Sequence, residues 1–124
     1  MREYVLRFRA AQVTSEACDD ENIAYVFFRS EAFPHGHYLM ISRALGSKTK
    51  PGVFVEYNDQ AQVTVDGIST YQLQEDSLTL EVPPEAAEEL GLPDVRQIVV
   101  DFCLQSASLS ELRRAMMAIF ADSN

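Results

Sequence analysis

Alternating apolar and polar positions predict a series of β-strands along most of the chain. Near the N-terminus, Tyr4, Leu6 and Phe8 share one face of such a strand, and the opposite face is mostly charged. The segment 23–29 is apolar on both faces, which is typical of a central strand. The segment 14–22 is polar and acidic, and we expect a loop or a frayed extension there. Further strands are expected at residues 37–43, 52–57, 62–65 and 96–104.

Polar turn signals separate the predicted strands. Residues 58–60 have short polar side chains that can bond their own backbone, and the Asp-Gly pair at 66–67 is a strong turn signal. The strands 68–74 and 77–82 flank the acidic pair at 75–76 and predict a β-hairpin.

Two helices are expected late in the chain. The first covers residues 83–91, because Pro84 suits the first turn of a helix and Gly91 suits a left-handed end. In the second, Ser108 followed by Glu111 matches a capping box. One side of this second helix is apolar at helical spacing and contains Leu109, Leu112, Met116, Ile119 and Phe120.

Together these elements predict an α+β fold for a single domain over residues 1–124. We expect an antiparallel sheet of about six to seven strands, with the short helix and the C-terminal helix packed on one face. The length of 124 residues is enough to build a core without disulfides or metal ions.

The net charge of −9 excludes several classes of partner. Residues 63–124 hold three basic and eleven acidic side chains, and their net charge is −8. Phosphate binding requires a basic surface, so neither nucleic acid nor an anionic membrane surface is an expected partner. An acidic surface is compatible with steering toward a basic protein. The N-terminus lacks the apolar block of a signal peptide and no long apolar stretch follows, so we expect a cytoplasmic chain without a membrane span.

Metal and cysteine chemistry have little support in the sequence. The two cysteines, Cys18 and Cys103, form no CxxC or CxxH pattern, so no zinc site is expected. Cys103 lies within the predicted strand 96–104 and is expected to be a small buried side chain. His35 and His37 would share one face of a strand as half of a metal site, but Pro34 and Gly36 indicate a loop. No cofactor is expected.

Catalytic motifs are absent as well. The sequence contains no GxSxG, HExxH, P-loop or GxGxxG pattern. Its isolated carboxylates, Glu56, Asp59, Asp66 and Asp101, show no pairing of the kind that acid–base catalysis requires. Asp101 interrupts an apolar strand and would face either solvent or a partner. A binding protein is therefore favoured over an enzyme.

Over about residues 37–120 the chain resembles immunity protein family 10 of bacterial polymorphic toxin systems, whereas residues 1–36 match only loosely. The resemblance lies in the order and spacing of several segments rather than in one motif. These segments are Tyr38 to Arg43, Val53 to Gln60, Gly67-Ile68, the hairpin to Ser77–Leu80, Ala86-Ala87 before Leu90-Gly91, Ile98 to Phe102, and the helix Leu109 to Phe120.

The resemblance implies an immunity protein that binds a cognate bacterial toxin domain and neutralises it by occlusion, without catalysis. Many toxin domains of these systems are basic nucleases. An acidic face that imitates nucleic acid would fit the net charge of −8 in residues 63–124.

The candidate contacts with the toxin are acidic and aromatic. The polar segment around Glu56 and Asp59 is the first choice, and the rings of Tyr57 or Tyr71 would supply an apolar centre. The acidic pair at 75–76 is either a further anchor or a solvated hairpin turn. The predicted partner-binding residues are Glu56, Tyr57, Asn58, Asp59, Tyr71, Glu75 and Asp76.

Two other readings remain open. The chain could be a small ligand-binding or enzymatic α+β domain with a pocket between the sheet and the C-terminal helix. A deep apolar pocket containing Asp101 or His37 would favour that reading, and a flat, acidic, exposed sheet face would favour toxin binding. A homodimer joined through an edge strand or an apolar helix face is the third reading, so the expected state is a monomer or a homodimer.

Overall fold

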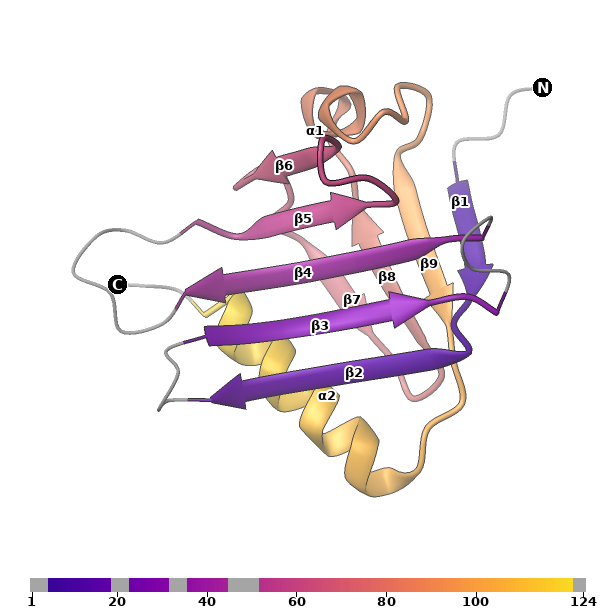
Figure 1. Cartoon of the computed structure of the whole chain (residues 1–124), viewed down its shortest axis with the longest axis vertical. Helices are drawn as coiled ribbons and strands as arrows, with labels where there is room; N and C mark the ends of the chain where they lie inside the picture. Colours follow the sequence, from indigo (N-terminus) through magenta and orange to yellow (C-terminus); the bar gives the residue numbers. More distant parts are fainter. Residues whose placement is uncertain (1–4, 19–22, 32–35, 45–51, 122–124) are drawn as a thin grey trace.

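The computed structural model describes residues 5–18, 23–31, 36–44 and 52–121, and contains nine strands and two helices there (Figure 1). The strands are β1 (Val5–Arg9), β2 (Gln12–Cys18), β3 (Ile23–Arg29), β4 (Tyr38–Ala44), β5 (Phe54–Tyr57), β6 (Val63–Val65), β7 (Tyr71–Leu73), β8 (Ser77–Glu81) and β9 (Gln97–Asp101). The helices are α1 (Pro84–Glu89) and α2 (Ser106–Ile119). Neither of these helices is long and apolar enough to cross a membrane.

The strands form two sheets, not the single sheet of six to seven strands that the sequence predicted. The five-stranded sheet is antiparallel, in the order β2-β3-β4-β5-β6. The four-stranded sheet has the order β1-β9-β8-β7 and contains one parallel pair, β1 with β9. The α+β class is confirmed. Alternation identifies strands, but it does not identify their partners, and the first strand pairs with the last.

Strand β2 replaces part of the predicted loop at residues 14–22, so that prediction is wrong for residues 14–18. This strand is at the edge of its sheet and pairs with β3 along all seven of its residues. Val13 and Ala17 pack against the core, while Thr14 and Glu16 lie on the opposite face. An edge strand with small inward side chains shows little hydrophobic contrast, which explains the error. Residues 19–22 lie outside the described residues.

The core lies between the two sheets. Inward side chains of β3 and β4, such as Phe28 and Leu39, are fully buried, as are Leu80 and Ile98 of the four-stranded sheet. The rings of Phe28 and Phe102 stack with their centroids 6.1 Å apart and connect β3 with the end of β9. Burying an apolar side chain of this size contributes roughly 1.5–3 kcal/mol, so these inward positions dominate the stability of the fold.

Helix α2 covers the part of the five-stranded sheet that the four-stranded sheet leaves free. It packs against β2 and β3 (Figure 1), with Leu109, Leu112, Ala115, Met116 and Ile119 buried. The amphipathic pattern is therefore confirmed. The predicted capping box is wrong, because the helix begins at Ser106 after Gln105 and has no side-chain cap.

The short helix and its end follow the sequence signals. Helix α1 has Pro84 in its first turn, and Gly91 adopts a φ of 75°, as expected for a left-handed end. The amide of Leu92 donates to the carbonyl of Ala87, 2.8 Å away, and closes the helix. Cys103, in contrast, is exposed rather than buried, because the chain leaves β9 after Asp101 and Phe102 takes the inward position.

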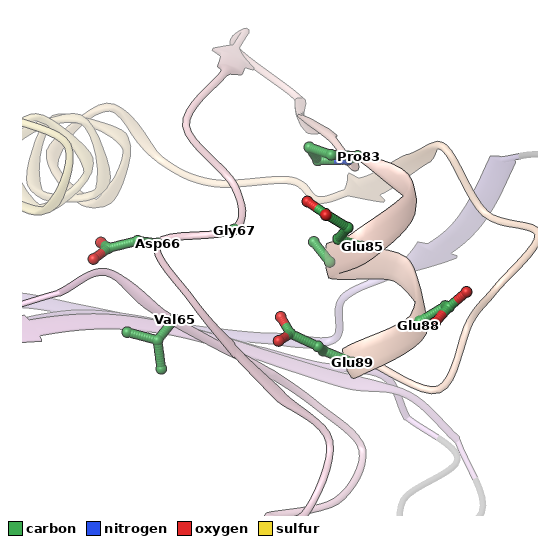
Figure 2. A pocket seen from close by; sticks show the side chains of 8 residues that line it. Val65, Asp66, Gly67, Pro83, Glu85, Glu88 and Glu89 are labelled. Atoms are coloured by element: carbon green, nitrogen blue, oxygen red, sulfur yellow. The ribbon is translucent and has the colours of Figure 1, made fainter.

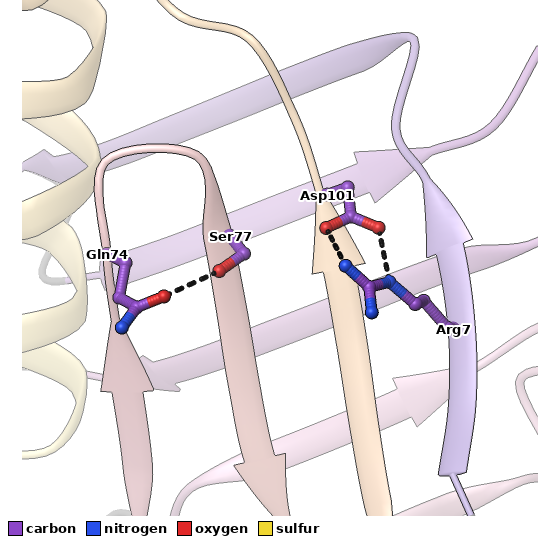
Figure 3. Close-up of polar contacts among 4 residues, drawn as sticks. All are labelled: Arg7, Gln74, Ser77 and Asp101. Carbon is purple, nitrogen blue, oxygen red and sulfur yellow. Dashed lines mark hydrogen bonds and ion pairs between the residues drawn. The ribbon is translucent and has the colours of Figure 1, made fainter.

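An ion pair joins the first and last strands on the outer face of the four-stranded sheet (Figure 3). Arg7 Nε donates to Asp101 Oδ2 at 2.7 Å, and Arg7 Nη2 donates to Asp101 Oδ1 at 3.0 Å. The hydrogen bonds and positive charge of Arg7 hold the pKa of Asp101 below its ordinary value of 3.8. Asp101 therefore faces a partner within the chain rather than solvent alone.

Two adjacent methionines test the packing of α2. Met116 is fully buried, whereas 67% of Met117 is exposed. Met116→Ala should lower the free energy of unfolding by about 2–5 kcal/mol, because it leaves a cavity in the core. Met117→Ala, the matched control, should change it by less than about 0.5 kcal/mol. Urea denaturation measures both, and equal effects would contradict the packing described.

The Arg7–Asp101 pair predicts a pH-dependent contribution to stability. The pKa of Asp101 is lower in the folded state than its ordinary value of 3.8. The ion pair therefore stabilises the folded protein fully at pH values above 3.8. This stabilisation is lost as the pH falls through the pKa of Asp101 in the folded state. Wild type should therefore be more stable than Asp101→Asn at about pH 7, and this difference should shrink as the pH falls from 3.8 toward about 2. Urea midpoints at both pH values measure it, and a difference that persists in acid would contradict the ion-pair assignment.

Candidate partner-binding surface

The outer face of the five-stranded sheet has no described element packed against it. Figure 1 shows this sheet in front, with the four-stranded sheet and α2 behind it. We call its outward side chains on β2 to β6 the open face. Those described are Gln12, Thr14, Glu16, Ile23, Tyr25, Phe27, Arg29, Tyr38, Met40, Ser42, Ala44, Phe54, Glu56, Val63 and Val65. This face is rich in aromatic and aliphatic groups, which favours contact with another protein.

Glu56 lies on the open face and is held there by Tyr38. The hydroxyl of Tyr38 donates to Glu56 Oε2 at 2.5 Å. Burial, together with this hydrogen bond and the negative charge of Glu56, raises the pKa of Tyr38 to about 12. The ring of Tyr38 lies 5.7 Å from that of Phe27. Glu56, a predicted contact with the toxin, therefore has a fixed orientation and lies close to aromatic side chains.

The residue that follows it, Tyr57, points the other way. Only 6% of Tyr57 is exposed, and its hydroxyl lies 2.5 Å from Nδ1 of His37 in a hydrogen bond. Burial raises the pKa of Tyr57. His37 also stacks on Phe8, with ring centroids 5.0 Å apart. Tyr57 and His37 therefore connect the two sheets from inside, and Tyr57 supports the open face from behind.

Asn58 and Asp59 shape the turn after β5, as the sequence predicted. Asn58 has a φ of 61°, a conformation that asparagine tolerates better than most residues. Its Oδ1 accepts the amide of Tyr38 at 2.6 Å, and its Nδ2 donates to the carbonyl of Gly36 at 3.1 Å. Asp59 is exposed, and its Oδ1 accepts the amide of Ala61 at 2.8 Å. Asp59 thus lies in the turn that directly follows the strand bearing Glu56.

The other predicted contacts belong to the four-stranded sheet. Tyr71 packs against Phe120, with ring centroids 4.7 Å apart. Glu75 and Asp76 are exposed in the turn between β7 and β8, where the amide of Gln74 donates to the carbonyl of Ser77 at 2.8 Å. The hydroxyl of Ser77 also donates to the side-chain oxygen of Gln74 at 3.3 Å (Figure 3). The predicted hairpin is confirmed. The seven predicted residues are therefore divided between two sheets and do not form one surface.

A hollow between β7 and α2 occupies the region where the small-ligand reading expected a pocket. It measures about 410 Å³ and is lined by Tyr71, Gln72, Leu73, Arg113 and Met117. Asp101 and His37, the residues expected in such a pocket, are engaged elsewhere, with Arg7 and with Tyr57. Within the described residues, no group of three His, Cys, Asp or Glu side chains could hold a metal ion. His35 lies outside the described residues.

Sequence reasoning missed a second hollow, between β6 and α1 (Figure 2). It measures about 680 Å³, and its described lining consists of Val65, Asp66, Gly67, Pro83, Glu85, Ala86, Glu88 and Glu89. We call it the acidic hollow. The glutamates of α1 and the Asp-Gly turn were visible in the sequence. Their proximity was not, because it depends on how α1 packs against β6.

Close packing at Gly67 and Thr64 shapes the acidic hollow. A Cβ atom at Gly67 would lie 2.1 Å from Thr64 Oγ1 and 3.0 Å from the Cβ of Ala86, so only glycine fits there. Thr64 is fully buried, and its hydroxyl donates to Glu89 Oε1 at 2.5 Å. Asp66 is anchored as well, because its Oδ1 accepts the amide of Val53 at 2.9 Å.

Comparison with known proteins identifies the family. A family model described as immunity protein 10 matches residues 9–110. The match includes β2, β3 and the rest of residues 9–36, a region whose resemblance to the family is only loose by inspection of the sequence. It ends within α2. Neither the curated proteins nor the solved structures gave a match. Because the family match spans well over half of the chain, this protein belongs to the immunity protein 10 family.

Proposed function

We propose that this chain is a cytoplasmic immunity protein that binds a cognate bacterial toxin domain and neutralises it by occlusion, without catalysis. The family match over residues 9–110 is the observation that carries the proposal. The open face supports it, because an uncovered sheet face rich in aromatic groups is a suitable site for a protein partner.

The surroundings of the titratable groups favour binding over catalysis. Asp101, whose pKa is lowered, is paired with Arg7 on the outside of a sheet. Tyr38 and Tyr57, whose pKa values are raised, bond to Glu56 and His37 respectively. Each shift thus has a structural cause, and the two tyrosines project from opposite faces of the sheet. Acid–base catalysis instead needs two tuned groups that face one reacting bond.

The charge of the chain supports a basic toxin, such as a nuclease. With a net charge of −9, the protein attracts a positively charged domain at long range and speeds its association. In the proposed complex, Glu56 on the open face and Asp59 in the adjoining turn contact the toxin. Glu75 and Asp76 belong to the other sheet and form the rival surface.

The proposed function is tested by capturing the toxin and then measuring its activity. The tagged chain is used to isolate partners from the source cells, which are identified by mass spectrometry. A captured toxin domain is then expressed with and without this chain. We expect a stoichiometric complex and restored growth of the host cells. A toxin domain that stays active within a stable complex would contradict neutralisation by occlusion.

The proposed contacts of Glu56 and Asp59 predict the effect of charge reversal. The double variant Glu56→Lys and Asp59→Lys should weaken the binding of the purified toxin domain at least about tenfold, because attraction becomes repulsion. Isothermal titration calorimetry measures the dissociation constant. Glu56→Gln should weaken binding less than the double variant, because it retains an acceptor for Tyr38 and removes one attractive charge without adding repulsion. Unchanged affinity of the double variant would contradict this site while leaving the proposed function intact.

A further inference from the structure

The most exposed apolar side chains of the open face are adjacent to each other. Among the described residues, four large hydrophobic side chains are exposed: Val5, Phe54, Val65 and Met117. Phe54 is 46% exposed and Val65 is 50% exposed, and the two are direct cross-strand partners on β5 and β6. Side chains in this position touch, so they form one apolar patch at the β6 margin of the open face. Val5 and Met117 lie on other elements.

The acidic hollow begins where this patch ends. Val65 belongs to both, since it lies on the open face and also lines the hollow. Figure 2 shows Glu85 and Glu89 on the side of α1 that faces β6 and Gly67. These two glutamates are four positions apart on the helix, so their like charges are neighbours. The described side chains that line the hollow include no basic group.

The electrostatics of α1 favour the arrival of a cation. The last turn of the helix contains Glu88 and Glu89 and no basic residue, although the C-terminal end of a helix favours positive charge. Glu89 is also fixed in place by the hydroxyl of Thr64. A positive group in the hollow would relieve the repulsion between Glu89 and its neighbour Glu85. An apolar patch beside an acidic hollow matches a chain segment that carries both an apolar and a cationic side chain.

We propose that the β5–β6 margin docks a basic segment of the cognate toxin, with Phe54 and Val65 as the apolar centre and Glu85 and Glu89 receiving an arginine or lysine. This inference rests on the proposed function and specifies the surface and the chemistry of the partner. A nucleic acid could not occupy the same place, because its phosphates would meet the carboxylates of Glu85 and Glu89. The occupant is therefore a protein.

The test compares matched variants in binding the purified toxin domain that the wild-type chain captures. Phe54→Ala removes the apolar centre. Glu85→Gln with Glu89→Gln removes two charges and retains an acceptor for Thr64. Isothermal titration calorimetry at about 0.05 M and 0.3 M salt gives the dissociation constants. We expect each variant to weaken binding at least about tenfold at low salt, and the double glutamine variant to reduce the salt dependence.

Two controls separate the surface from general effects of charge and hydrophobicity. Glu75→Gln with Asp76→Asn removes the same charge from the rival surface, and Met117→Ala removes an exposed apolar side chain from α2. Both should change the dissociation constant less than about twofold. Because Phe54, Glu85 and Glu89 are exposed, the variants should fold, and thermal denaturation verifies this.

The outcomes distinguish the inference from the proposed function. If wild type binds the toxin but the Phe54 and double glutamine variants bind equally well, the docking surface is wrong and the function stands. If the variant of Glu75 and Asp76 loses affinity instead, the rival surface is the interface. If the wild-type chain captures no toxin domain from the source cells, the proposed function fails and the inference fails with it.

Discussion

The five-stranded sheet is covered on one face only, and the rest of the structure depends on this constraint. The four-stranded sheet and α2 together cover its inner face, through contacts such as the stacked rings of Phe28 and Phe102. Stable antiparallel sheets commonly bury one face and leave the other in solvent. Here the solvent face contains Phe27, Tyr38 and Phe54 rather than a uniformly polar set. Packing on one face therefore completes the core and leaves the other face uncovered, where the proposed protein partner would bind.

Local sequence signals predicted the elements well and their pairing poorly. The pattern of β3, the hairpin of β7 and β8, and the apolar side of α2 depend on neighbouring residues, so periodicity and turn chemistry identify them. The parallel pairing of β1 with β9 joins residues more than ninety positions apart, such as Leu6 and Ile98. No local pattern encodes that choice. The pairing belongs to the tertiary arrangement, in which the four-stranded sheet and α2 lie behind the five-stranded sheet.

The same limit applies to the candidate binding surface. Glu56 faces outward on β5, because it alternates with the buried Val55 and Tyr57, and alternation of this kind is a local pattern. The acidic hollow was not foreseen, because Asp66 and Glu89 become neighbours only when α1 packs against β6. That packing depends on Gly67, where any larger residue would collide with Thr64. A tertiary contact, rather than any segment of the sequence, creates the hollow.

The polar contacts of the molecule differ in how well their charges are compensated. Asp101 is matched by the guanidinium of Arg7, and Glu56 accepts a hydrogen bond from Tyr38. At α1, in contrast, Glu85 and Glu89 are neighbours of like charge at a helix that has no basic residue in its last turn. Natural sequences are usually consistent across local and tertiary levels, and departures from this consistency concentrate at functional sites. In the proposed complex, a cation from the toxin would relieve this repulsion, so that part of the binding free energy would come from a conflict already present in the free protein.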